Sequence, residues 1–150
     1  MIRFWSGDLS SWAGDSCECG RTYPRLPKGI YGRVDDMLIV RGENVYPSAI
    51  EEVLRATRGF GEEFRIIISR EEAMDELVVQ AEYNPEVAAR AEQRPDLLEA
   101  LRKEIAERLR ATIGVWAKVE LMPPDVLPRT EFKARRVVDN RDLFREHSKE

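Results

Sequence analysis

The chain has 150 residues, of which 43% are hydrophobic, and 24 basic and 28 acidic residues give it a net charge of −4. This composition suits one globular domain with a hydrophobic core, and the interspersed charges leave no broad basic surface for nucleic acid or an anionic membrane. No apolar run approaches the roughly 20 residues of a membrane-spanning helix, and no apolar signal-peptide core follows the first methionine, so we expect a cytoplasmic protein.

Residues 1–31 are rich in Gly, Ser, Pro and Trp and show little periodicity after a short strand-like start. We therefore expect this part of the chain to lack a core of its own. Its two cysteines, Cys17 and Cys19, are separated by one residue, which is too close for an unstrained disulfide. They are predicted to be reduced thiols or metal ligands.

The stretch from Gly32 to Glu52, GRVDDMLIVRGENVYPSAIEE, reads as a turn, a strand, a glycine turn and a helix. The charged GRVDD suits a hinge or a polar site, Met37–Val40 suits a short buried strand, and Gly42 can adopt a backbone conformation closed to other residues. A proline and the capping-box spacing of Ser48 and Glu51 then predict the start of a helix. By itself this pattern also fits an ordinary strand-to-helix unit.

Regular periodicity from residue 36 onward predicts six elements in the order β-α-β-β-α-β. They are strands at 36–41, 63–69, 76–83 and 117–122 and helices at 48–56 and 96–113. With right-handed crossovers this order gives an α+β, ferredoxin-like βαββαβ sandwich, in which both helices cover one face of an antiparallel sheet. Residues 70–75 are predicted to be a charged turn, and residues 84–94 a solvated, partly helical loop.

Three motifs, in order along the chain, resemble those of adenylate-forming enzymes, and most of all those of the phenylacetate-CoA ligase family. They are FWSGDL at 4–9, GRVDDMLIVRGENVYPSAIEE at 32–52 and LPRTEFKARRVVD at 127–139. In that family the first motif closes a large N-terminal domain and the second opens a small C-terminal domain. The resemblance therefore covers both ends of the chain.

The resemblance also implies a division of the chain into two parts. Residues 1–31 would be the end of a large N-terminal AMP-binding domain, otherwise absent from this chain, together with a linker. Residues 32–150 would be the C-terminal lid domain, with a hinge at 33–36 and a lysine loop at 127–136. The large domain, on the same or a separate chain, would be the partner of this one.

Five residues fall on functional positions of the family motifs. By resemblance, Asp8 would bind the ribose hydroxyls of ATP or AMP, Arg33 would contact the ribose-phosphate region, and Asp35 would be the hinge residue. Lys133 would be the catalytic lysine that orients the substrate carboxylate and the α-phosphate, and Gly42 would form the turn beside the coenzyme A tunnel. Without the resemblance, Lys133 is an exposed loop lysine and Asp8 a turn residue.

Two features limit the resemblance. The family usually has glycine before the lysine, whereas this sequence has Phe132, whose side chain restricts the loop backbone. The segment CECGRT at 17–22 resembles one in which cysteines contribute to a zinc site, but structural zinc usually takes four Cys or His ligands. Cys17 and Cys19 are half of such a set, so zinc is not expected in this chain alone.

Taken together, the motifs indicate a fragment of an AMP-forming acid-thiol ligase of phenylacetate catabolism. The complete enzyme would use Mg²⁺-ATP, an aryl carboxylic acid and coenzyme A, and the isolated chain is expected to be inactive. The alternative is a stand-alone ferredoxin-like module that binds a ligand or a protein without catalysis, because this topology hosts many functions. RNA binding on the sheet is not expected, since the central strands lack the aromatic residues that would stack on bases.

Overall fold

The computed structural model describes residues 5–14, 17–26, 29–71, 73–94, 96–129 and 136–141. The helices are α1 (Pro47–Arg55), α2 (Pro85–Ala91) and α3 (Asp96–Ile113), preceded by a short 3₁₀ helix, η1 (Val34–Asp36). The strands are β1 (Asp8–Leu9), β2 (Gly32–Arg33), β3 (Leu38–Val40), β4 (Glu43–Val45), β5 (Phe60–Glu71), β6 (Met74–Tyr83), β7 (Lys118–Met122) and β8 (Val137–Asp139).

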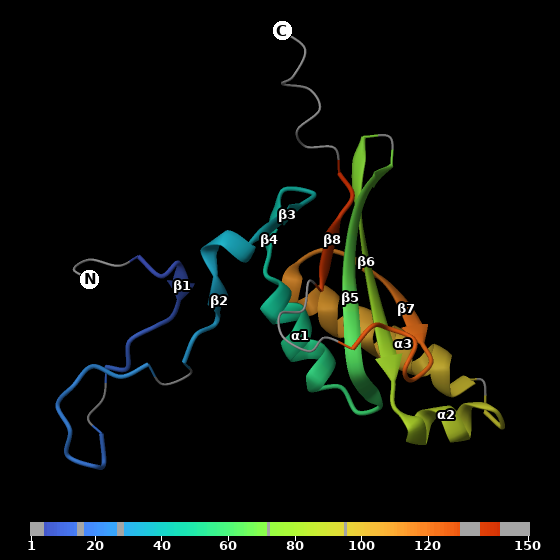
Figure 1. Cartoon of the computed structure of the whole chain (residues 1–150), viewed down its shortest axis with the longest axis horizontal. Coiled ribbons are helices and arrows are strands. Elements are labelled where there is room, and N and C mark those ends of the chain that lie inside the picture. Colours follow the sequence, from blue (N-terminus) through green and yellow to red (C-terminus); the bar gives the residue numbers. More distant parts are fainter. Residues whose placement is uncertain are drawn as a thin grey trace, which may run out of the picture.

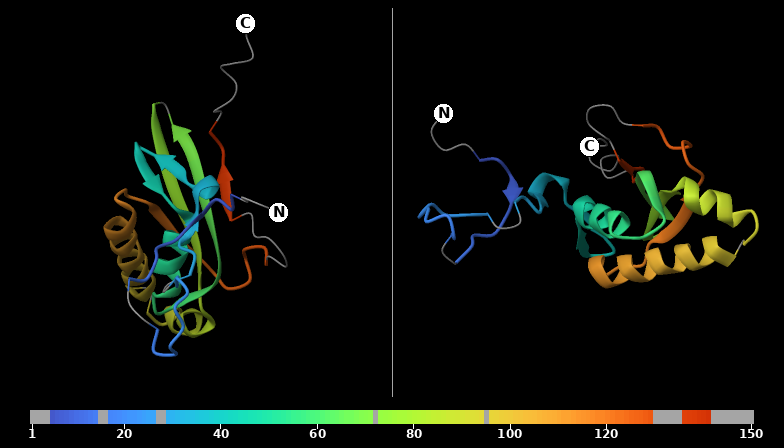
Figure 2. Two further views of the ribbon diagram at one scale, coloured as in Figure 1. Left: turned by 90° about the vertical axis from the view of Figure 1, so that its left-hand side faces the viewer. Right: turned by 90° about the horizontal axis from the view of Figure 1, so that it is seen from below.

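The centre of the molecule is a four-stranded sheet in the order β7-β6-β5-β8 (Figure 1). β5 and β6 form a long antiparallel hairpin, while β7 and β8 run parallel to their neighbours at the two edges. Helices α1 and α3 lie together against one face of this sheet (Figure 2). The predicted α+β class, with helices over one face of the sheet, is confirmed.

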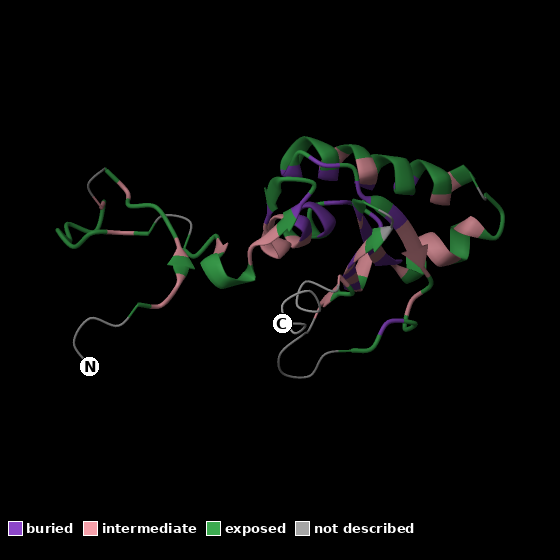
Figure 3. Ribbon diagram, turned by 90° about the horizontal axis from the view of Figure 1, so that it is seen from above, coloured by how far each residue is buried: buried purple, intermediate pink, exposed green. Residues whose placement is uncertain are grey.

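The core lies between that face of the sheet and the two helices (Figure 3). In α3 the predicted fourth-residue repeat is buried at Leu101, Ile105, Leu109 and Ile113. In β5 and β6 alternate residues are buried, as expected of strands with one face against a core; they are Phe64, Ile66, Ile68, Leu77, Val79 and Ala81. Apart from the smaller Ala81, each of these side chains contributes about 1.5–3 kcal/mol when fully buried.

The predicted first strand, 36–41, is shorter than expected and does not join the main sheet. β3 instead pairs with β4 as a separate antiparallel hairpin, in which Val40 faces Glu43. The two turn residues between them, Arg41 and Gly42, have positive φ angles of 52° and 83°. Two successive residues of this kind make the tight turn that reverses a strand at once.

The edge of the sheet beside β5 is occupied by β8, a strand that the sequence pattern did not predict. The sheet is therefore mixed, where an antiparallel sheet was expected. The separate β3–β4 hairpin still contributes to the core, because Val40 and Val45 are fully buried.

Smaller elements also differ from the expectations. α1 begins at Pro47 with Tyr46 as its N-cap and no side-chain cap, so the predicted capping box is wrong. The expected loop at 84–94 contains α2, whose N-cap Asn84 accepts a hydrogen bond from the Val87 amide at 2.9 Å. The predicted charged turn at 70–75 is mostly an extension of the β5–β6 hairpin, since Arg70 pairs with Asp75.

Of the residues described before Gly32, only Asp8–Leu9 form a strand, and this part of the chain lies to one side of the sandwich (Figure 1). Of the residues described there, none is buried, and Trp5, Trp12 and Tyr23 are each at least 72% exposed. This agrees with the expectation that the segment lacks a core of its own. Across the described part of the chain, no helix is both long and apolar enough to cross a membrane.

Candidate functional site

Three of the predicted site residues meet where β1 and β2 pair. Asp8 lies opposite Arg33 in this pair, and the Val34 amide donates a hydrogen bond to the Gly7 carbonyl at 2.7 Å. Arg33 donates from Nε to Asp35 Oδ1 at 2.9 Å and from Nη2 to Asp35 Oδ2 at 2.8 Å. Its Nη1 lies 3.9 Å from Asp8 Oδ1. Asp8 thus forms one cluster with two residues that lie 25 and 27 positions later in the sequence.

The charges of this cluster stabilise one another. The hydrogen bond to Asp35 raises the pKa of the Arg33 guanidinium, and the same bond lowers the pKa of the Asp35 carboxyl. The two side chains are 49% and 62% exposed, however, so water screens the pair and a competing anion can reach the guanidinium. A guanidinium suits phosphate oxygens, and the Asp8 carboxylate can accept two hydrogen bonds from a diol.

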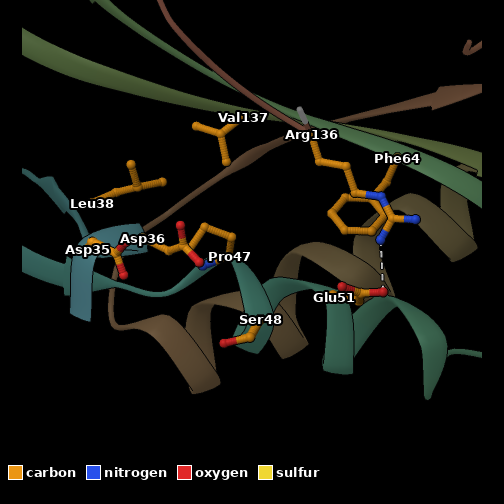
Figure 4. Close-up of a pocket in the computed structure, with 9 residues that line it drawn as sticks. All are labelled: Asp35, Asp36, Leu38, Pro47, Ser48, Glu51, Phe64, Arg136 and Val137. Carbon is orange, nitrogen blue, oxygen red and sulfur yellow. Dashed lines mark hydrogen bonds and ion pairs between the residues drawn. The ribbon is translucent and has the colours of Figure 1, made fainter. Parts of the chain in front are cut away.

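A pocket of about 500 Å³ lies beside the cluster, between η1, α1, β5 and the start of β8 (Figure 4). It is lined by Asp35, Asp36, Leu38, Pro47, Ser48, Glu51, Phe64, Arg136 and Val137. Arg136 donates from Nη1 to Glu51 at 2.8 Å, and its guanidinium lies over the Phe64 ring at 4.5 Å. Burial raises the pKa of Glu51, but hydrogen bonds from Arg55 and Arg136 outweigh it and hold this pKa below its usual range.

Arg136 was not singled out by the sequence reasoning, although it ends the predicted lysine loop. Its Nε atom is buried and has no hydrogen-bond partner among the residues that the structure describes. The other end of the loop is fixed by Glu82, which is buried and accepts a hydrogen bond from the Leu127 amide at 2.7 Å. Lys133 and Phe132, between these two anchors, lie outside the described residues.

Gly42 is not part of the cluster or the pocket. It lies in the β3–β4 turn, whose tip points away from β1 and β2 (Figure 1). Its φ angle of 83° favours glycine, and a Cβ atom placed on it would meet no described atom within 4 Å. The predicted tunnel turn is therefore open on the side where a side chain would lie.

A second group of charges that the sequence reasoning missed surrounds Arg141, just after β8. Arg141 donates from Nε and Nη2 to Asp139 at 2.9 and 2.7 Å and from Nη1 to Asp75 Oδ2 at 2.9 Å. Nη1 also donates to the Ile39 carbonyl at 2.6 Å, and Arg70 Nε donates to Asp75 Oδ1 at 3.0 Å. The only signal in the sequence is an arginine on either side of a short apolar pair, RVVDNR.

Arg141 and Asp75 are nearly buried, with side chains 6% and 10% exposed. The hydrogen bond to Asp139 raises the pKa of Arg141 and lowers that of Asp139. For Asp75 burial alone would raise the pKa, but hydrogen bonds from Arg70 and Arg141 lower it further than burial raises it. All three groups are thus held in their charged forms.

The two cysteines do not form a metal site with other described residues. Cys17 and Cys19 are free thiols with their sulfur atoms 2.7 Å apart, shorter than the roughly 3.8 Å between two thiolates on a tetrahedral zinc. The described residues contain no group of three or more His, Cys, Asp or Glu side chains that could hold a metal ion.

Known proteins similar to this chain include phenylacetate-coenzyme A ligases. A family model described as the AMP-binding enzyme C-terminal domain matches residues 42–141. A phenylacetate-coenzyme A ligase from Thermus thermophilus is 38% identical over 94% of this chain and 34% of its own length. The chain thus spans about a third of the length of the curated relatives it matches.

Solved structures give the same family. A 2-hydroxyisobutyryl-CoA ligase in the postadenylation state with 2-HIB-AMP is 51% identical over 97% of this chain and 30% of its own, with a TM-score of 0.82. In complex with 2-HIB-AMP and CoA in the thioesterification state, the same ligase has the same identity and coverage but a TM-score of 0.69. A crystallised domain of phenylacetate-coenzyme A ligase from Bacteroides vulgatus is 33% identical over 73% of this chain and 97% of its own, with a TM-score of 0.64. This chain therefore belongs to the AMP-binding enzyme C-terminal domain family and corresponds to the C-terminal portion of phenylacetate-CoA ligases.

Proposed function

We propose that the complete protein activates a carboxylic acid with ATP and transfers the acyl group to coenzyme A. In the first step a carboxylate oxygen attacks the α-phosphorus and displaces pyrophosphate, which leaves an acyl-adenylate. In the second step the coenzyme A sulfur attacks the acyl carbon, the bond to AMP breaks, and the thiol proton is released. This chain closes over the site for the first step and rotates for the second, and Mg²⁺ enters with the nucleotide.

The observation that carries this proposal is the meeting of Asp8, Arg33 and Asp35 where β1 pairs with β2. We assign Asp8 to the ribose hydroxyls and Arg33 to the ribose-phosphate region. A nucleotide phosphate would compete with Asp35 for the exposed Arg33 guanidinium, so nucleotide binding and the contact at residue 35 are linked. Asp35 is accordingly the hinge residue, within a hinge at 33–36.

A rotation about this hinge is supported by the two structures of the 2-hydroxyisobutyryl-CoA ligase. Identity and coverage are the same for both, so the fall in TM-score from 0.82 to 0.69 reflects conformation and not sequence. We propose that residues 1–31 move with the large domain and that residues 32–150 form the lid. The exposed Trp5, Trp12 and Tyr23 then have their contact surface on the large domain, which is the partner of this chain in the cytoplasm.

In this proposal two loops of the lid take turns at the active site. Lys133, in the loop at 127–136, stabilises the charge that develops on the α-phosphate during adenylation. After rotation the Gly42 turn takes its place, and the absence of a side chain lets the pantetheine arm of coenzyme A approach. The open space beside Gly42 fits this role.

Two classes of acid substrate are consistent with the relatives. The curated relatives named phenylacetate-CoA ligases support an aryl acid, whereas the higher identity to a 2-hydroxyisobutyryl-CoA ligase, 51% against 38%, supports a short branched hydroxy acid. Both acids belong in the assays below, and pyrophosphate release will distinguish them.

The test is Lys133→Ala in the complete protein, or in this chain supplied with its large domain. Acyl-adenylate formation should fall by roughly two to three powers of ten, since about 3–4 kcal/mol of transition-state stabilisation is lost. Conversion of a supplied acyl-adenylate to thioester should be nearly unchanged. Lys118→Ala, which removes an exposed lysine paired with Glu120, is the matched control and should affect neither step.

Equal loss of both half-reactions in Lys133→Ala, with the fold intact, would contradict alternating use of the lid. The isolated chain should release no pyrophosphate with ATP and either acid. Pyrophosphate release by the pure chain would overturn the assignment of residues 32–150 as a lid that depends on a large domain. No activity from the complete protein would instead leave a stand-alone ligand- or protein-binding module as the better description.

A further inference from the structure

We propose that Arg141 is a positioning residue that holds the Gly42 turn in place through Asp75. The proposal rests on the role given to this turn above, but the contacts that carry it all lie within the described residues. Arg141 contacts neither the cluster of Asp8, Arg33 and Asp35 nor the pocket beside it. Its effect on the reaction would therefore pass through the hairpin.

The β3–β4 hairpin needs such a support because little else fixes its tip. Each strand has three residues, and neither is hydrogen-bonded to the four-stranded sheet. Two-stranded hairpins of this size are marginal by themselves. One face is anchored by the buried Val40 and Val45, while Ile39 on the other face is 53% exposed.

The support consists of three hydrogen bonds that join the hairpin, Asp75 and Arg141. Arg41, the first residue of the turn, donates from Nε to the Asp75 backbone carbonyl at 2.7 Å. From the other side, Arg141 donates from Nη1 to both the Ile39 carbonyl and the Asp75 carboxylate. Asp75 thus links Arg41, which precedes Gly42, to Arg141, which lies after β8.

Arginine is needed at position 141 because the bonds spread over a planar fork. Nε and Nη2 are used by Asp139, which leaves Nη1 to reach Asp75 and Ile39. A lysine ammonium keeps the positive charge, but its three donors sit on one nitrogen and cannot match the four acceptor oxygens that the arginine fork reaches. Arg141→Lys should therefore loosen the hairpin while leaving Asp75 with a nearby cation.

Arg70→Lys is the matched control. Arg70 donates to the other oxygen of the same Asp75 carboxylate at 3.0 Å, and its side chain is 49% exposed. It makes no hydrogen bond or ion pair with the hairpin in the described part of the chain. The two substitutions are chemically identical and both affect Asp75, but Arg141 is more buried and also bonds Ile39 and Asp139.

The first measurement is amide hydrogen exchange on this chain. In Arg141→Lys the amides of residues 38–45 should exchange roughly ten- to a hundredfold faster, the range expected for loss of one charge-assisted hydrogen bond, while β6 amides change less than about twofold. Arg70→Lys should leave both sets within about twofold. Equal hairpin exchange in the two variants, or an equal increase throughout the chain, would overturn the proposal.

The second measurement separates the half-reactions in the complete protein. Arg141→Lys should slow thioester formation from a supplied acyl-adenylate by about tenfold and leave adenylation within about twofold, as expected of an effect on one state of the lid. Equal loss of both steps, or unchanged thioester formation, would overturn the positioning role. A wild-type protein that performs neither step refutes the proposed function, while hydrogen exchange still decides whether Arg141 holds the turn.

Discussion

Gly42→Ala should lower the rate of thioester formation by more than its loss of stability explains. At a φ angle of 83° alanine is strained, at a cost of about 1–2 kcal/mol. No described atom lies within 4 Å of the new methyl group, so a steric cost in the lid itself is not expected. Unfolding in urea should therefore show a loss of about 1–2 kcal/mol and no more.

The rate of thioester formation should also fall if the pantetheine arm passes this turn. A methyl group placed in a fitted contact commonly costs about 1–3 kcal/mol, or roughly 5- to 150-fold in rate. The assay is conversion of a supplied acyl-adenylate to thioester by the complete protein, over a series of coenzyme A concentrations. Adenylation, measured by pyrophosphate release, should be unchanged.

Gly114→Ala is the control for backbone strain. Gly114 has a φ angle of 78°, and the nearest atom to its added Cβ, in Glu43, would lie at an ordinary 3.9 Å. The variant should lose as much stability as Gly42→Ala and keep full thioester activity. Equal losses of thioester formation in the two glycine variants would refute the placement of coenzyme A beside the Gly42 turn.

Two further predictions concern the contacts that hold the lid together. Glu82→Ala should lower the free energy of unfolding by about 1–3 kcal/mol, because the Leu127 amide loses its buried acceptor. Glu82→Gln keeps an acceptor oxygen there and should lower it by less. Equal losses of the two variants in urea denaturation would contradict this. The lowered pKa of Asp139, caused by Arg141, stabilises the fold above the ordinary carboxyl pKa, so stability should fall as the pH drops below about 4. A free energy of unfolding that stays level between about pH 6 and about pH 3 would contradict the assignment.

The sequence by itself determined the elements whose burial repeats with a regular period. The fourth-residue repeat in α3 and the alternation in β5 and β6 identified both the element and its inward face, because each depends only on residues near in sequence. The resemblance of the motifs also identified Asp8, Arg33 and Asp35 as candidates for one site. That these three side chains meet depends on the pairing of β1 with β2, which the motifs do not encode locally.

The tertiary structure alone decided the partners of the short strands. With three residues each, β3 and β8 are too short to carry a readable period, and periodicity names an inward face but not a neighbour. The two turn residues with positive φ reverse the chain so that β3 pairs with β4, and β8 occupies the edge of the sheet beside β5. Because local patterns do not identify tertiary neighbours, they also did not predict the charged contacts of Arg141. Arg141 lies 66 residues from Asp75 and 102 from Ile39, and a charge pattern along the chain cannot show contacts that exist only after β8 has docked.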